Sequence, residues 1–146
     1  MDRELKREII LDNYQNPSNR GLTNKDNYYK VNSNNESCID NLDIEVLIEN
    51  DVIKDINFDG EACAISTSAT SIMINTFIGK SIEEAKSIIE NYENMIDEKE
   101  YNSDILEELN VYDDIYKQAN RKKCALLPIE GLKKIINNYI GGKNEK

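Results

Sequence analysis

The sequence predicts an α+β fold, in which a small antiparallel sheet of about three strands is covered on one face by helices. Two observations lead to this prediction. Alternating apolar residues, which are typical of half-buried strands, fall within residues 28–58. Apolar residues spaced three and four apart, which are typical of helices, recur after residue 63. The strands therefore come first and most of the helices second.

The elements of the first half are expected in the following order. Residues 3–14 predict a short amphipathic helix that ends before Asn16-Pro17, because the residue before a proline disfavours helical geometry. Tyr28, Tyr29 and Val31 indicate a first strand. Alternation from Leu42 to Ile48 indicates a second, and residues 52–58 a third that ends at Asp59-Gly60. Asn50-Asp51 between the last two strands fits a tight hairpin turn.

Helices are expected to follow the sheet. A helix over 63–78 would end at Gly79, and Ser81 with Glu84 forms a capping-box pattern for the next helix. Residues 97–104 are expected to form a loop, and 105–117 carry a weaker helical pattern. The last helix is expected to begin near Cys124, with Pro128 in or just beyond its first turn and Gly141-Gly142 at its end.

The size and composition of the chain limit the possible classes of protein. Its 146 residues suit a single domain over 1–146 with one core, and no internal repeat is visible. No apolar run approaches the ~20 residues that cross a bilayer, so no membrane segment is expected. The charged N-terminus does not resemble a signal peptide, and the expected location is cytoplasmic.

The charged and ionisable residues exclude several functions. The net charge of -10 argues against nucleic acid as a partner and favours a basic protein partner. The chain has no histidine, which excludes Ser-His-Asp and Cys-His triads and zincin motifs. Any chemistry must therefore come from thiol, carboxylate, amine or hydroxyl groups, or from a metal.

The three cysteines, Cys38, Cys63 and Cys124, fall at element junctions of the predicted map. Cys63 and Cys124 are expected at helix N-termini, where the backbone N–H groups and the helix dipole favour the thiolate. Asp40 follows Cys38 by two residues, so in extended chain both point to one side. Three sulfurs and one carboxylate oxygen would suit tetrahedral zinc. The long spacings, without a C-x-x-C pair, leave separate buried thiols as an equal interpretation.

Four motifs, in order between residues 10 and 127, resemble those of SufU-type proteins of the IscU and NifU N-terminal superfamily. Residues 10–21 read ILDNYQNPSNRG and are similar to the family's N-terminal signature. Residues 38–40 read CID where the family has C-G-D, and residues 58–66 read FDGEACAIS. Residues 121–127 read RKKCALL. Lys123, in place of the histidine of IscU-type scaffolds, and an insertion over 97–117 resemble the SufU branch.

The resemblance implies a SufE/IscU-like fold and a zinc site made by Cys38, Asp40, Cys63 and Cys124. It implies that the protein works with a PLP-dependent cysteine desulfurase of the SufS type. Cys38 would accept persulfide sulfur for iron–sulfur cluster assembly, with a downstream cluster scaffold as a possible further partner. Cys38, Asp40 and Arg121 are the candidate catalytic residues, with Arg121 stabilising the charged site.

Two alternatives remain open at this point: a scaffold for a cluster, and a non-catalytic interaction protein whose cysteines are structural. The same ligands would suit iron or a [2Fe–2S] cluster, which would make the protein a scaffold on which a cluster is assembled and transferred. Ile39 and Ala62 stand where the family has glycine, and glycine permits positive φ where isoleucine resists it. The sequence therefore predicts that Ile39 hinders movement of Cys38 more than it hinders metal binding.

Overall fold

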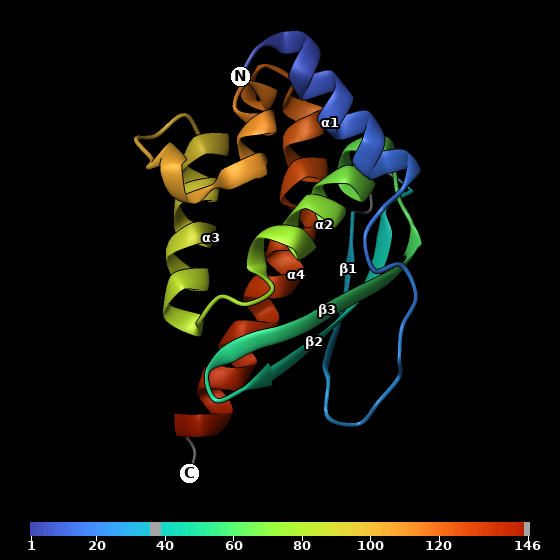
Figure 1. Ribbon diagram of the computed structural model, residues 1–146, viewed down its shortest axis with the longest axis vertical. Coiled ribbons are helices and arrows are strands. Elements are labelled where there is room, and N and C mark those ends of the chain that lie inside the picture. Colours follow the sequence, from blue (N-terminus) through green and yellow to red (C-terminus); the bar gives the residue numbers. More distant parts are fainter. Residues whose placement is uncertain (36–38, 145–146) are drawn as a thin grey trace.

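A computed structural model describes residues 1–35 and 39–144 of the chain (Figure 1). As the sequence predicts, the strands come before most of the helices. The helices and strands are, within the described residues, α1 (Arg3–Gln15), β1 (Tyr29–Asn34), β2 (Asn41–Glu49), β3 (Val52–Glu61), α2 (Ala64–Phe77), α3 (Ile82–Ile96), three short 3-10 helices η1 (Ser103–Ile105), η2 (Glu107–Tyr112) and η3 (Ile115–Lys117), and α4 (Ala119–Asn144).

The three strands form one antiparallel sheet in the order β1-β2-β3, as the sequence predicts. Asn50 and Asp51 both have positive φ, 53° and 61°, which matches the tight hairpin turn expected there. The predicted end of the third strand at Asp59-Gly60 was wrong, because β3 continues to Glu61. Gly60 stays in register with Leu42 at a φ of 121°, a conformation that only glycine adopts without strain.

Helices α2 and α4 cover one face of the sheet, and α3 lies on their far side (Figure 1). Leu42, Ile44 and Val46 of β2 are completely or almost completely buried under them, as the alternation predicts. Helix α4 approaches the sheet closely at Gly131, where an added Cβ would lie 2.9 Å from Ile44 Cδ1. The core therefore lies between the sheet and the two helices.

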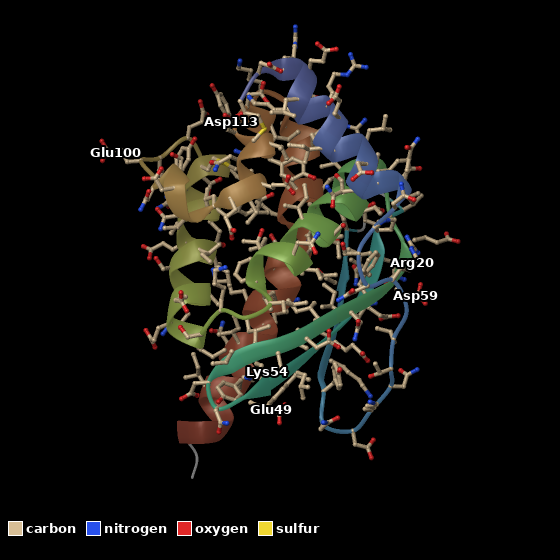
Figure 2. All side chains as sticks on the ribbon, in the orientation of Figure 1. Arg20, Glu49, Lys54, Asp59, Glu100 and Asp113 are labelled. Carbon is tan, nitrogen blue, oxygen red and sulfur yellow. The ribbon has the colours of Figure 1, made fainter. Side chains whose placement is uncertain are left out.

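The segment 16–28, which connects α1 to β1, covers the other face of the sheet and the free edge of β3. Glu45 is fully buried on this face, and its carboxylate accepts hydrogen bonds from the Thr23 N–H at 2.9 Å and from Asn57 Nδ2 at 2.9 Å. The Gly21 N–H donates to the Phe58 carbonyl at 2.7 Å, along the edge of β3. Arg20 and Asp59 form an exposed ion pair at this edge, as Figure 2 shows. The edge strand is thus protected from pairing with another chain.

The last helix differs from the sequence prediction at both ends. Helix α4 begins at Ala119 instead of near Cys124. It also continues through Gly141 and Gly142, where glycine weakens a helix without breaking it. Pro128 lies well inside α4, where the sequence placed it near the first turn.

The helix tolerates Pro128 because side chains satisfy the carbonyl groups around it. Proline lacks the N–H that would bond to the carbonyl four residues earlier. That carbonyl belongs to Cys124, and the Ser66 hydroxyl oxygen lies within hydrogen-bond distance of it, at 3.0 Å. The Leu127 carbonyl similarly accepts from Ser33 Oγ at 2.9 Å, and the Ala125 carbonyl from the Tyr92 hydroxyl at 2.8 Å.

The region over 105–117 forms 3-10 turns in place of the weak helix that its pattern suggests. Leu106, Leu109 and Tyr112 are buried in it, and its turns are too short to repeat an α-helical face. The capping box of Ser81 and Glu84 is confirmed at the start of α3. Among the described residues, no helix is both long and apolar enough to cross a membrane.

Candidate metal centre

Cys63 lies at the junction between β3 and α2, where the sequence places it. It is the N-cap residue of α2, with extended backbone, and its Sγ accepts a hydrogen bond from the Ser66 N–H at 3.4 Å. The side chain is half-buried. An N-cap side chain faces the free N–H groups of the first helical turn. Cys63 therefore lies at a helix N-terminus, as the sequence predicts.

Asp40 is 1% exposed and directly precedes β2. Its Oδ1 accepts from the Cys63 N–H at 2.7 Å, and its Oδ2 accepts from Ser66 Oγ at 2.6 Å. Burial alone would raise the pKa of this carboxyl, but the hydrogen bonds from Ser66 and Cys63 outweigh it and lower the pKa. Asp40 is therefore an ionised carboxylate at neutral pH, with both oxygens directed by α2.

Cys124 is buried in the second turn of α4, so the predicted place at a helix N-terminus was wrong. Its Sγ lies 3.6 Å from the Asn120 carbonyl, one turn earlier in the helix. Burial raises the pKa of this thiol, and the nearby Cys63 and Asp40 raise it further. A cation bound beside it would favour the thiolate, since the local obstacle is desolvation together with negative charge.

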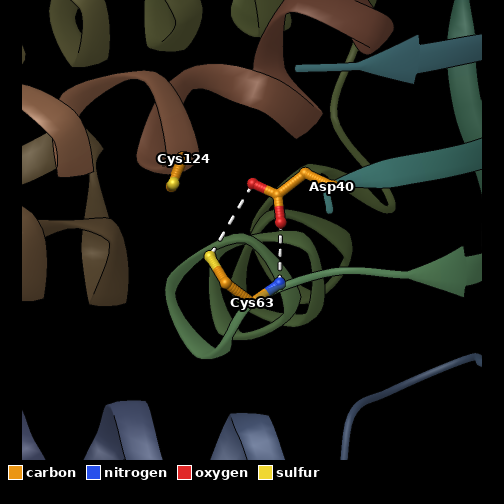
Figure 3. Close-up of side chains that lie close together, drawn as sticks. All are labelled: Asp40, Cys63 and Cys124. Carbon is orange, nitrogen blue, oxygen red and sulfur yellow. Dashed lines mark hydrogen bonds between the residues drawn. The ribbon is translucent and has the colours of Figure 1, made fainter. Parts of the chain in front are cut away.

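The three side chains converge at one point although they come from three elements (Figure 3). One ligand atom from each of Asp40, Cys63 and Cys124 lies within 4.8 Å of the other two. Cys63 Sγ is 3.7 Å from Asp40 Oδ2. In a tetrahedral zinc site the ligand atoms are about 3.5–4 Å apart, because the Zn–S bond is about 2.3 Å. Two thiols and a carboxylate at these distances fit zinc or iron with little movement.

Cys38, the fourth predicted ligand, lies outside the described residues. The chain on either side of this segment is described: the Asn35 N–H donates to the Asp40 carbonyl at 3.0 Å, and Ile39 is 70% exposed. Ala62, which stands where the family has glycine, is not among the described residues with positive φ. That substitution therefore carries no backbone strain.

The basic residues before Cys124 lie at the surface. Arg121 is exposed and one helical turn before Cys124, so the two share a face of α4. Lys122 pairs with Asp97 at 3.7 Å, and Lys123 is exposed. Arg121 therefore lies one turn from Cys124 on α4, and it makes no ion pair within the part of the chain that the structure describes.

Ser66 belongs to the site, and reasoning from the sequence missed it. The run 66–71 reads as small residues for tight packing, and most of it does pack. Ser66, however, touches Asp40, Cys63 and the Cys124 carbonyl. The signal was its position three residues after Cys63, since the third residue of a helix faces the N-cap side chain.

A family model described as "NifU-like N terminal domain" matches residues 5–146. The zinc-dependent sulfurtransferase SufU of Bacillus subtilis is 34% identical over 139 residues, which cover 94% of this chain and 93% of that protein. The iron–sulfur cluster assembly scaffold protein IscU of Thermotoga maritima is 32% identical over 102 residues, 70% of this chain and 72% of that one.

A solved structure has the same fold and a similar sequence. It is a putative iron–sulfur cluster assembly scaffold protein for the SUF system from Fervidobacterium islandicum. It superposes with a TM-score of 0.82 at 31% identity, and the match covers 92% of this chain and 99% of that one. The resemblance seen in the four sequence motifs therefore extends over almost the whole chain.

Proposed function

The chain belongs to the NifU-like N-terminal domain family, and we propose that it is a zinc-dependent sulfurtransferase for iron–sulfur cluster assembly. It would accept persulfide sulfur from a PLP-dependent cysteine desulfurase of the SufS type. One observation carries the proposal: Asp40, Cys63 and Cys124 converge from three elements of the fold. The relative of 34% identity, which is named as a zinc-dependent sulfurtransferase, supports the same role.

The proposed ligands are Cys38, Asp40, Cys63 and Cys124, and the domain extends over 1–146. Bound zinc would supply positive charge that keeps the thiols deprotonated. Asp40 would be the one oxygen ligand among three sulfur ligands. It is therefore the ligand that a group of the cysteine desulfurase would most readily replace. Arg121 would add positive charge at the rim.

Cys38 is the proposed sulfur acceptor. Its thiolate would attack the outer sulfur of the desulfurase cysteine persulfide. One S–S bond forms as the other breaks, and the desulfurase cysteine leaves as a thiolate. The product is a persulfide on Cys38, and no external oxidant or reductant is needed. Cys38 directly precedes Ile39, which is 70% exposed.

A transfer assay tests this proposal. The protein is mixed with a SufS-type cysteine desulfurase and cysteine, and the sulfur bound to each cysteine is located by mass spectrometry. We expect one added sulfur on Cys38, faster formation of alanine, and loss of both effects in Cys38→Ser. Exposed Ser87→Ala is the control and should behave as wild type. Unchanged alanine formation with wild-type protein would contradict the transfer role.

The second candidate function is that of a scaffold for a [2Fe–2S] cluster. Two observations favour it: relatives named as scaffold proteins cover most of the chain, and the ligand set also suits iron. Lys123 occupies the place of the histidine found in IscU-type scaffolds, which favours the zinc role. Colour separates the two, since a cluster protein is brown after anaerobic purification and a zinc protein is colourless.

A further inference from the structure

We propose that Ser66 is the positioning residue of the metal centre, holding Asp40 in the orientation in which its carboxylate can bind the metal. The inference rests on the proposed zinc-binding function and goes beyond its four ligands. Ser66 is completely buried, comes from the first turn of α2, and contacts three neighbouring groups of the site.

The hydrogen bonds of Asp40 lead to this assignment. A carboxylate at the end of a flexible side chain binds a metal well only when its plane is fixed, and hydrogen-bond donors around metal ligands do this. Asp40 Oδ1 is held by the backbone N–H of Cys63 at 2.7 Å, which no side-chain substitution removes. Asp40 Oδ2 is held by Ser66 Oγ at 2.6 Å. Oδ2 is also the oxygen 3.7 Å from Cys63 Sγ, so it faces the sulfur ligands.

Ser66 also connects Asp40 to the helix that carries Cys124. Its hydroxyl lies 3.0 Å from the Cys124 carbonyl, which is free to accept because Pro128 has no N–H. A serine hydroxyl has one proton and two acceptors within reach, so it donates to only one at a time. The contact with Asp40 Oδ2 is the shorter one, at 2.6 Å. Ser66 thus lies between Asp40 just before β2, Cys63 at the N-cap of α2, and Cys124 of α4.

Two other buried serines of α2 make their hydrogen bonds away from the site. Ser68 contacts the Ile65 carbonyl and the Tyr112 hydroxyl, and Ser71 donates to Asn13. Ser68 is as completely buried as Ser66, lies two residues further along the same helix, and has no hydrogen bond to any of the three described ligands. Ser68→Ala is therefore the matched control for the loss of one buried hydroxyl.

Zinc affinity tests the proposal. The zinc dissociation constant is measured by competition with a chromophoric chelator for wild type, Ser66→Ala and Ser68→Ala. We expect Ser66→Ala to bind zinc about 10- to 100-fold more weakly, and Ser68→Ala to bind as wild type. The absorption spectrum of the cobalt(II)-loaded protein should change for Ser66→Ala alone. Equal affinities and spectra for the two variants would overturn the proposal.

A double-mutant cycle shows whether Ser66 acts through Asp40. If it does, Ser66→Ala should cost no further affinity in a chain that already carries Asp40→Ala. A full additional loss in that background would overturn the assignment. Should Ser66→Ala fail to fold, Ser66→Thr and Ser66→Val replace it, because they have the same shape and differ in the hydroxyl. Tighter zinc binding by the threonine variant supports the proposal, and equal binding overturns it.

Zinc binding by the wild-type protein distinguishes failure of this proposal from failure of the proposed function. A wild-type protein that binds no zinc would contradict both. Tight zinc binding by wild type, with the same affinity in Ser66→Ala, would contradict only the role of Ser66.

Discussion

The two cysteines of the described site differ in how far solvent can reach them. Cys124 is 3% exposed, whereas Cys63 is half-buried at the start of α2. Burial also raises the pKa of the Cys124 thiol, so less of it is thiolate at neutral pH. Alkylating reagents attack thiolates that they can reach. The two positions should therefore react at different rates although they lie side by side.

We expect iodoacetamide to modify Cys63 at least about ten-fold faster than Cys124 in metal-free protein at pH 7.5. Mass spectrometry of the two peptides over time measures this, with urea-unfolded protein as the control in which the rates become similar. Faster reaction of Cys124 in the folded protein would mean that the second turn of α4 is open to solvent, against the structure.

Glu45 is a buried carboxylate away from the candidate metal centre, and its ionisation affects the stability of the fold. Burial alone would raise its pKa, but bonds from Thr23 and Asn57, together with the Asn24 N–H, lower it. A group whose pKa is lower in the folded than in the unfolded protein stabilises the fold above its unfolded pKa. That stabilisation is lost as the pH falls below about 4.5, the ordinary value for glutamate.

Glu45→Gln should therefore lower the free energy of unfolding by about 1–3 kcal/mol at pH 7, because it replaces a charged acceptor of several donors. The difference from wild type should shrink towards pH 3. Urea unfolding at both values measures it. The exposed Glu49→Gln is the control and should differ little from wild type at either pH (Figure 2). An equal difference at pH 7 and pH 3 would contradict this role of Glu45.

At the scale of elements, β3 depends on a glycine that the sequence interpretation took for a strand end. A Cβ on Gly60 would lie 2.2 Å from the Asn41 carbonyl oxygen, in a strand that begins directly after Asp40. Gly21 has a similar φ, 118° against 121°, but nothing lies within 4 Å of its added Cβ. Comparing substitutions at Gly60 and Gly21 therefore separates the effect of a steric clash from the effect of backbone strain.

Gly60→Ala should lower the free energy of unfolding by more than about 3 kcal/mol, because it adds a backbone clash to the strain. Gly21→Ala should lower it by about 1–2 kcal/mol through strain alone. Chemical denaturation of both variants gives the comparison. If the two substitutions cost the same, β2 and β3 can separate at this point, which the pairing of Gly60 with Leu42 does not allow.

Local patterns predicted most elements, and the failures have identifiable physical causes. The alternation in β2 and the capping box of Ser81 act locally, so they can be read along the chain. Pro128 could not be placed from the sequence, because Ser66, Tyr92 and Ser33 satisfy the surrounding carbonyls from other elements. The predicted place of Cys124 at a helix N-terminus was also wrong. The distance between Cys124 and Cys63 depends on how α4 packs against α2, which no local pattern specifies.

At the scale of the whole molecule, the fold does not depend on a metal for its core. Within the described residues, every buried side-chain nitrogen and oxygen has a hydrogen-bond partner, including those of Asp40. A continuous apolar cluster joins the sheet, α2, α3 and α4. This differs from small zinc domains, which have too little core to fold without metal.

We therefore expect chelation of the proposed zinc to leave the far-ultraviolet circular dichroism spectrum unchanged. The thermal midpoint should fall, because a ligand that binds only the folded state stabilises it, and it should recover when zinc is added back. The chelator with the Cys63→Ala protein is the control, and should shift its midpoint little. Loss of the helical signal on chelation would show that the metal holds the fold together.

The metal content of freshly purified protein tests the central claim most directly. Elemental analysis should find about one zinc per chain in wild type, much less in Asp40→Ala, and the wild-type amount in Asp43→Ala, whose exposed carboxylate lies three residues further along the chain, in β2. Iron with acid-labile sulfide in place of zinc would assign the scaffold role. No metal in wild type, or equal zinc in all three proteins, would contradict a site made by Asp40 with the cysteines.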